Sequence, residues 1–462
     1  MASNWLDFTR YAVWGLGRSG KAAANLLARH EKNVVASDIR SEEQLAADVG
    51  DLHEDVEWVA GENVFANAEV IVTSPGLKPG LQLFEVARQR GIPVISEVDL
   101  AFDASNATWV GITGTDGKTT TTGLVGAMME AAGRQHVVAG NIGTALCDVV
   151  EDLDERGVVV AEISANQLWS CHHLAVDSAA ITNIADDHLD YFDDFSEYPA
   201  AKYRLVRLQG DEGVAVLPGG DDEIRAALFG HVSDDVTWFG VESDLQSELQ
   251  QVVYFDEHGE GWWHNEDERH RWFDDFGTTH LFGPHNQRNA ACAAALARSV
   301  GTEWDCIAEG LRNYQPPPHR MQPVGQIDGI TYIDDSKATN VHASLAGLEG
   351  VQPPLVVIAG GRDKGLDLSE WAAVVAEKAD CTVVIGEITD RMTRLLEQRG
   401  GRVFCADTLP EAVTRAHNES GPGTTVVLSP ACSSYDMFSS YRQRGEVFQK
   451  AVQKQAGQHE EC

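Results

Sequence analysis

Residues 110–124, VGITGTDGKTTTTGL, combine residue types that bind phosphate in nucleotide-binding proteins. A short apolar stretch leads into a glycine-broken loop, and Lys118 is followed by four threonines. The backbone N–H groups of such a loop at a helix N-terminus point at anionic oxygens, the lysine adds a positive charge, and Thr119 or Thr120 can hold a magnesium ion. Ile112 stands where a strict Walker A sequence has its first glycine. The stretch therefore predicts a phosphate loop that departs from the strict pattern.

Further polar side chains follow two other apolar stretches of the same segment. Glu162 lies near the end of VVVAEIS, and His188 lies in the acidic run TNIADDHLDYFDDF. Because ligands bind beyond the carboxyl ends of parallel strands, both are placed to hold a divalent metal. A buried ion pair for Glu162 and a solvated imidazole for His188 are the alternatives. Lys202 lies in a predominantly apolar helix, where a surface lysine with a buried stem is the ordinary interpretation.

The last third of the chain shows the same arrangement at four places. Four short motifs with polar side chains each follow a strand-like stretch or stand at its end. They are HRM with Arg320, DDSKATN with Asp335 and Thr339, GGRDKG with Lys364, and SPACSS with Ser434. A lysine, a serine and a threonine at three different strand ends would converge on a small anion such as a carboxylate.

Strands and helices must bring these groups together, and the chain divides into three segments that supply them. The first contains YAVWGLGRSG and then NVVASD, which ends at Asp38. Its glycine spacing and the acid about 20 residues on are those of a βαβ unit that binds a dinucleotide, although another nucleotide diphosphate or a structural role is an equal alternative. The second segment alternates strands and helices, and its residues 231–280 suggest a small antiparallel excursion.

The third segment follows the proline cluster YQPPPHR at 314–320, which we interpret as a linker. Its five apolar strands, separated by single helices, predict a doubly wound parallel sheet. The predicted fold class is α/β with three domains: a Rossmann-like N-terminal domain (1–106), a central P-loop-type ATPase domain (107–317) and a C-terminal Rossmann-like doubly wound domain (318–462).

Composition excludes several classes of protein. The 71 acidic and 35 basic residues give a net charge of −36, which argues against nucleic-acid binding. Adaptation to salt and a generally acidic soluble enzyme both explain this charge. The sequence has neither an apolar run of about 18 residues nor an N-terminal signal pattern, so we expect a cytoplasmic protein without membrane contact. Its eight scattered cysteines are expected to be reduced core thiols.

Nearly the whole chain is spanned, in this order, by the motifs GTDGKTTT, NIG (141–143), AEIS, TNIADDHLDY, YPAAKYR, GPHNQRNA, HRM and DDSKATN. This set resembles the Mur ligase family, ATP-dependent enzymes that form amide bonds in peptidoglycan precursor synthesis. The resemblance implies a UDP-binding first domain, a central ATPase and a C-terminal domain that contacts amino acid and adenosine. It also implies that the glycine loop of the first segment faces UDP and not NAD.

The resemblance further implies roles for individual residues. The ATP contacts would be Gly114, Thr115, Asp116, Gly117, Lys118, Thr119, Thr120, Asn286, Arg320 and Asp335. The UDP-substrate contacts would be Arg18, Ser19, Asp38, Arg40, Asn141, Ser164 and Gln167. The incoming amino acid would meet Thr339, Lys364, Ser434 and Tyr441. One magnesium ion would be held by Thr119 and Glu162, and a second by His188 and a carbamylated Lys202. The catalytic residues would be Lys118, Lys202, His188 and Arg320.

The implied reaction has two steps. The carboxylate of UDP-N-acetylmuramoyl-L-alanine attacks the γ-phosphate of ATP to give an acyl phosphate, and the amine of D-glutamate then displaces phosphate. We expect a monomer. A sister ligase that adds L-glutamate or another amino acid, including a folylpolyglutamate-like enzyme, remains open because it shares the ATP machinery. An NAD-dependent dehydrogenase leaves GTDGKTT unexplained. A non-catalytic scaffold predicts the loss of a site residue, yet Lys118, Glu162, His188 and Lys202 are all present.

Overall fold

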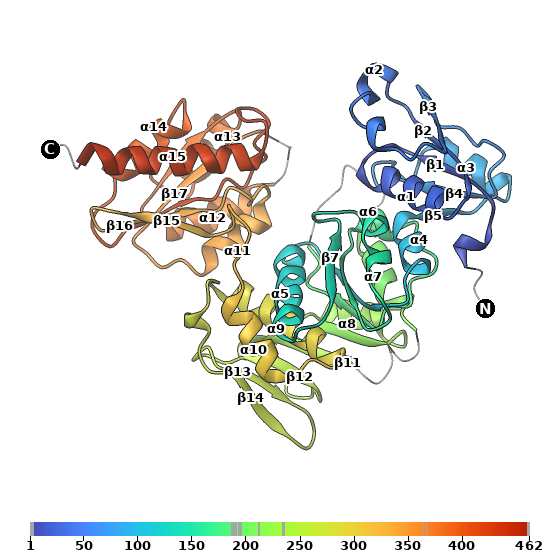
Figure 1. Cartoon of the computed structure of the whole chain (residues 1–462). Coiled ribbons are helices and arrows are strands. Elements are labelled where there is room, and N and C mark those ends of the chain that lie inside the picture. The colour runs from blue at the N-terminus through green and yellow to red at the C-terminus, as the bar shows by residue number, and fades with distance from the viewer. Residues whose placement is uncertain are drawn as a thin grey trace. The chain divides into compact units, whose positions relative to one another are not determined.

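The computed structural model of the chain describes residues 4–185, 192, 196–210, 213–232, 236–363, 365 and 367–459. These residues form three β-sheets with helices packed against them (Figure 1). The predicted α/β fold class is confirmed. The sheets belong to two compact units, Met1–Thr279 with Gln287–Tyr314, and His280–Asn286 with Gln315–Cys462. In the described part of the chain no helix is long and apolar enough to cross a membrane.

The first unit begins with a five-stranded parallel sheet. Its strands, in order across the sheet, are β3 (Val56–Ala60), β2 (Asn33–Asp38), β1 (Arg10–Trp14), β4 (Val70–Thr73) and β5 (Val94–Ser96). Its helices are α1 (Arg18–Arg29), α2 (Glu42–Leu45), α3 (Gln82–Gln89) and α4 (Glu97–Asp103).

The turn between β1 and α1 confirms the predicted βαβ unit. Gly15 has a φ of 88°, and a Cβ at Gly20 would lie 1.8 Å from the Gly15 carbonyl oxygen. Both positions therefore require glycine, the first for its conformation and the second for the close approach of helix and turn.

The same unit contains a nine-stranded sheet. Its strands, in order across the sheet, are β14 (Arg269–Phe273), β13 (Gly261–His264), β12 (Val252–Phe255), β11 (Val236–Val241), β10 (Val214–Pro218), β9 (Ser178–Ile181), β6 (Thr108–Thr113), β8 (Val158–Glu162) and β7 (His136–Gly140). Helices on it are α5 (Lys118–Ala131), α6 (Ala165–Leu168), α7 (Glu197–Arg207), α8 (Asp222–Leu228), α9 (Pro284–Ser299) and α10 (Trp304–Asn313).

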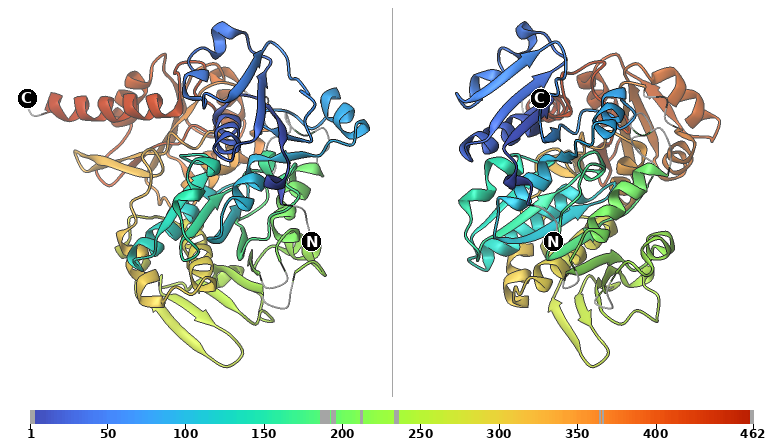
Figure 2. Two further views of the ribbon diagram at one scale, coloured as in Figure 1. Left: turned by 45° about the vertical axis from the view of Figure 1, so that its right-hand side comes forward. Right: turned by 90° about the vertical axis from the view of Figure 1, so that its right-hand side faces the viewer.

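The prediction of a separate antiparallel excursion at 231–280 is wrong in part. Strands β11 and β12 pair in parallel and continue the sheet, and only β13 and β14 are antiparallel. These two form a hairpin that projects at the end of the sheet in all three views (Figures 1 and 2). Single apolar runs do not show strand direction, so the sequence pattern alone did not separate the two pairs.

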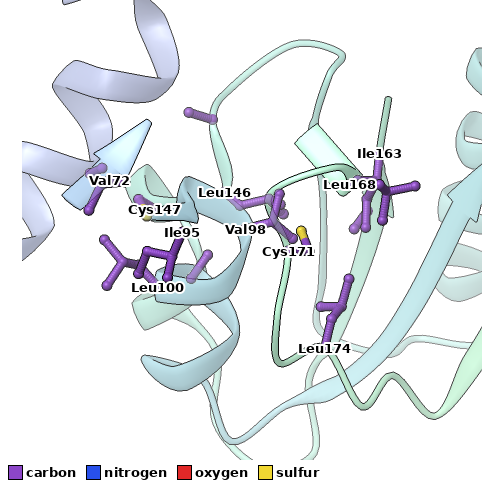
Figure 3. Close-up of a cluster of buried hydrophobic side chains, with 14 of the residues drawn as sticks. Val72, Ile95, Val98, Leu100, Leu146, Cys147, Ile163, Leu168, Cys171 and Leu174 are labelled. Carbon is purple, nitrogen blue, oxygen red and sulfur yellow. The ribbon is translucent and has the colours of Figure 1, made fainter. Parts of the chain in front are cut away.

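A continuous hydrophobic core joins the two sheets of the first unit (Figure 3). Val72 and Ile95 of the first sheet, Val98 of α4, and Leu146 and Cys147 of the 3-10 helix η3 (Leu146–Asp148) belong to it. All the cysteines among the described residues are free thiols, as predicted, and most are buried.

The second unit contains a six-stranded sheet. Its strands, in order across the sheet, are β15 (Gln322–Ile327), β16 (Ile330–Asp334), β20 (Thr425–Leu428), β17 (Leu355–Gly360), β18 (Cys381–Ile385) and β19 (Val403–Cys405). Its helices are α11 (Val341–Glu349), α12 (Ser369–Lys378), α13 (Thr389–Glu397), α14 (Leu409–Asn418) and α15 (Tyr441–His459).

Separate hydrophobic clusters, one with Trp371 of α12 and one with Phe448 of α15, show that helices cover both faces of this sheet. The five predicted strands are confirmed and, as predicted, parallel. The antiparallel strand β15 was missed. Its signal was the Asp328-Gly329 turn into β16, where both residues have positive φ as a two-residue hairpin requires.

Candidate active site

The phosphate loop lies between β6 and α5. Gly114 has a φ of 144° and Gly117 a φ of 78°, conformations that favour glycine. A Cβ would lie 1.9 Å from Thr182 Oγ1 at the first position and 2.2 Å from Asn289 Oδ1 at the second. Gly117, the N-cap residue of α5, has no side chain that could cap the helix, so the first N–H groups of α5 are left for another acceptor such as an anion.

The end of the neighbouring strand β9 holds the loop in shape. The Asn183 side chain accepts a hydrogen bond from the Asp116 N–H at 3.0 Å and donates one to the Asp116 carbonyl at 3.1 Å. Thr182 Oγ1 donates to the same carbonyl at 2.5 Å. Lys118 Nζ lies over the loop and donates to the carbonyl oxygens of Gly114 and Thr115, at 2.8 and 2.7 Å. Thr119 is half-buried and Thr120 buried in the first turn of α5.

Glu162 lies beside this loop because β8 pairs with β6 and places Glu162 opposite Ile112. Its carboxylate is buried. Oε1 accepts a hydrogen bond from Asn141 Nδ2 at 2.9 Å, whereas Oε2 is buried and has no hydrogen-bond partner among the described residues. A buried carboxylate oxygen without a donor is unfavourable unless something else, such as a cation, satisfies it.

Lys202 of α7 also reaches the loop. Its side chain is only 1% exposed, and Nζ donates to the Gly114 carbonyl oxygen at 2.6 Å. The amine lies 4.4 Å from the ring centre of Tyr198, whose hydroxyl is 3.2 Å from Thr115 Oγ1. The interpretation of Lys202 as a surface lysine is therefore wrong. The predicted metal ligand His188 lies outside the described residues.

The predicted UDP contacts fall into two groups in the first unit. Asp38 lies at the end of β2. Its Oδ2 accepts a hydrogen bond from the Leu16 N–H at 2.8 Å and forms an ion pair with Arg40 Nη2, also at 2.8 Å. Burial raises the pKa of the Asp38 carboxyl, but the hydrogen bonds from Arg40 and the backbone outweigh it and lower that pKa overall. Arg18 donates to the carbonyl oxygens of Gly143 and Gly140, at 2.5 and 3.0 Å. These hydrogen bonds connect the start of α1 to residues 140–143, the segment that contains Asn141.

Three other predicted contacts lie at the starts of helices. Ser164 and Gln167 form the capping box of α6, with Ser164 Oγ 2.9 Å from Gln167 Oε1. Ser19 is buried at the start of α1. Ser164 and Gln167 therefore stabilise the start of α6.

In the second unit the predicted residues gather at the carboxyl ends of adjacent strands. Asp335 follows β16, and burial raises the pKa of its carboxyl to about 7. Ser434 is buried after β20, and Thr339 is half-buried in the loop after β16. Tyr441 begins α15, with Lys337 Nζ 4.1 Å from its ring centre.

The remaining predicted residues of this unit are Arg320, Asn286 and Lys364. Arg320 is half-buried and follows His319, whose Nδ1 is 2.7 Å from Asp334 Oδ2. Asn286 Nδ2 donates to the Phe282 carbonyl at 2.9 Å. Lys364 lies outside the described residues.

Sequence reasoning missed several residues that shape these sites. Asn183 and Asn289, which stand in the quoted motifs TNIADDHLDY and GPHNQRNA, border the phosphate loop. Asp334 precedes the predicted Asp335, and its buried carboxylate is hydrogen-bonded to the His319 ring. The doubled acid in IDDSKATN was a signal that one of the two has a structural role.

Comparisons with known proteins identify the family of the chain. Family models match at residues 9–96 (Mur ligase MurD-like, N-terminal domain), 112–297 (Mur ligase middle domain) and 319–432 (Mur ligase, glutamate ligase domain).

Two curated relatives are UDP-N-acetylmuramoylalanine–D-glutamate ligases. That of Desulfitobacterium hafniense (strain DSM 10664 / DCB-2) is 37% identical, covering 96% of this chain and 97% of the relative. The ligase of Pelotomaculum thermopropionicum is 35% identical, and the match covers 96% of this chain and 98% of the relative. A solved pseudomurein peptide ligase type C from Methanothermus fervidus shares the fold, with a TM-score of 0.60 and 18% identity over 96% of this chain and 99% of that one. The chain therefore belongs to the Mur ligase family, in its UDP-N-acetylmuramoylalanine–D-glutamate ligase branch.

Proposed function

We propose that the protein is an ATP-dependent ligase that joins D-glutamate to the L-alanine carboxylate of UDP-N-acetylmuramoyl-L-alanine in peptidoglycan precursor synthesis. The observation that carries the proposal is the convergence at one phosphate loop of two lysines and a buried carboxylate. Lys118 and Lys202 both contact the Gly114 carbonyl, and Glu162 ends the adjacent strand. The D-glutamate ligases related to this chain supply the substrate assignment.

In the first step this chain's residues bind and neutralise phosphate. The N–H groups of the loop and α5, with Lys118, bind the β- and γ-phosphates, and Arg320 adds charge to the γ-phosphate. Negative charge increases on the phosphoryl oxygens as the substrate carboxylate attacks, so these cationic groups stabilise the transition state most. Asn286 and Asp335 hold the adenosine, and Thr115 and Asp116 shape the loop.

The residues present fit magnesium. Glu162 Oε2 is a buried carboxylate oxygen without a donor among the described residues, and Thr119 supplies a hydroxyl in the first turn of α5. His188 and a carbamate on Lys202 are proposed to hold a second ion. Bound magnesium would neutralise the phosphate oxygens during transfer. Carbon dioxide can convert a lysine amine to an anionic carbamate, and Lys202 is buried against the loop where such an oxygen ligand is needed.

The other substrates occupy the remaining predicted residues. Arg18, Ser19, Asp38, Arg40, Asn141, Ser164 and Gln167 would bind the UDP-muramoyl part. Thr339, Lys364, Ser434 and Tyr441 would bind D-glutamate, whose two carboxylates suit cationic and hydroxyl donors. We further propose three domains (1–106, 107–317 and 318–462) and a cytoplasmic monomer.

Phosphate release tests this function. Purified protein is given ATP, magnesium and UDP-N-acetylmuramoyl-L-alanine, with D-glutamate or L-glutamate in parallel over a range of KCl. Release that requires D-glutamate supports the proposal. Release with L-glutamate alone contradicts the assignment of the amino acid, and absence of release with either at every salt concentration contradicts the ligase activity.

A further inference from the structure

Arg444 is one of the largest completely buried side chains of the described structure, at 0% exposure. It lies in the first turn of α15, and burial lowers its pKa to about 10. Its hydrogen bonds with described residues go to neutral oxygens and not to a carboxylate. The charges of Asp436, Asp334 and Asp335 favour the guanidinium but do not outweigh its burial. A buried guanidinium without a hydrogen-bonded carboxylate among the described residues is costly, so its position calls for a reason.

The partners of Arg444 lie at the ends of three adjacent strands. Nε donates to Ser336 Oγ at 3.0 Å and Nη2 to the Ser336 carbonyl at 2.8 Å, just after β16. Nη1 donates to the carbonyl of Cys432 at 3.1 Å, after β20, and to that of Gly360 at 3.4 Å, at the end of β17. The planar guanidinium therefore fixes the spacing of three strand-end loops at once.

Two of these loops carry described residues that are proposed to bind the incoming amino acid. Thr339 follows Ser336 by three residues, and Ser434 follows Cys432 by two. A third proposed contact, Tyr441, is tied to the same group, because Ser336 Oγ donates to the Tyr441 carbonyl at 2.8 Å.

We propose that Arg444 is a positioning residue that holds these loops at the spacing D-glutamate requires, and thereby affects use of the amino acid more than use of ATP. The inference rests on the proposed function of the same loops. A residue needed only for folding would instead lower every step in proportion to the fraction of folded enzyme.

The test compares Arg444→Lys with Ser336→Ala. Lysine keeps the positive charge but has one nitrogen and cannot bridge three loops. Ser336→Ala is the milder change, since it removes only one acceptor and the bond to Tyr441. Arg402→Lys is the control, because Arg402 is in the same unit, pairs with Glu419 and is 60% exposed.

KM is measured for D-glutamate and for ATP, and the acyl phosphate is trapped with hydroxylamine in the absence of amino acid. We expect Arg444→Lys to raise KM for D-glutamate about tenfold and Ser336→Ala about threefold, with ATP KM and trapped acyl phosphate within about twofold of wild type. Arg402→Lys should change none of them.

Equal changes in both KM values, or loss of acyl phosphate together with D-glutamate use, would overturn the inference. If Arg444→Lys does not fold, Ser336→Ala decides alone. If the wild type uses another amino acid, the proposed substrate fails, and the same comparison with that amino acid still tests the role of Arg444.

Discussion

Gly445→Ala should destabilise the protein although alanine is the better helix former. Gly445 lies inside α15, and a Cβ there would be 2.1 Å from His319 Nδ1 and 2.7 Å from the ring carbon Cε1. The ring cannot move aside cheaply. His319 has a φ of 67°, and its Nδ1 is 2.7 Å from Oδ2 of the buried Asp334.

The magnitude follows from three opposing effects. Replacing a helical glycine by alanine gains about 1 kcal/mol. Forcing a methyl group into a packed core costs about 1–3 kcal/mol. Displacing His319 leaves the buried Asp334 carboxylate, among the described residues, with Gln449 and the Ser336 N–H as its donors, at a cost of about 1–3 kcal/mol. We therefore expect a net loss of about 3 kcal/mol in the free energy of unfolding.

Urea denaturation followed by circular dichroism measures this loss. Gly50→Ala is the control, because a Cβ there meets no atom within 4 Å, and its effect should stay within about 0.5 kcal/mol. In a His319→Ala background the conflict disappears, so Gly445→Ala should become neutral or stabilising by up to about 1 kcal/mol. A Gly445→Ala protein as stable as wild type, or the same loss in both backgrounds, would refute the reasoning.

Three further predictions concern the first unit. Burial raises the pKa of Glu97 to about 7 from 4.5, so the folded protein keeps a proton that the unfolded chain releases. The difference in free energy of unfolding between wild type and Glu97→Gln should therefore favour wild type most below pH 4.5. As the pH rises to 7, this difference should fall by about 3 kcal/mol, which denaturation at each pH measures. Lys118→Ala should lower ATP-dependent phosphate release at least about a thousandfold, whereas the exposed control Lys450→Ala should not. Lys202→Ala should regain part of its activity with short carboxylic acids, and no regain would count against the carbamate.

The sequence predicted the parts of the fold that depend on local pattern. The glycine loops at Gly15 and Gly114, and Glu162 at a strand end, follow from strand-to-turn transitions that single segments reveal. The order of the strands did not follow, because partners such as Ile112 of β6 and Ala180 of β9 lie far apart in the chain. The direction of β11 and β12 did not follow, because single apolar runs do not show strand direction.

The side chains that position the site were harder to predict than those at its surface. Arg444 and Ser336 are 108 positions apart, and His319 and Gly445 meet only because α15 packs against β15 and β16. Neither pair has a local spacing that a motif would show. Salt adaptation is the hypothesis for the large negative charge, and the KCl series of the phosphate assay tests it.

The acyl-phosphate route is the central claim, and oxygen transfer tests it most directly. UDP-N-acetylmuramoyl-L-alanine labelled with ¹⁸O at both carboxylate oxygens is incubated with ATP, magnesium and D-glutamate, and the released phosphate is examined by mass spectrometry. The account predicts one labelled oxygen in each phosphate, formed together with the D-glutamyl amide, because the carboxylate oxygen leaves with the phosphoryl group. Phosphate released without label, or no D-glutamyl product, would contradict it.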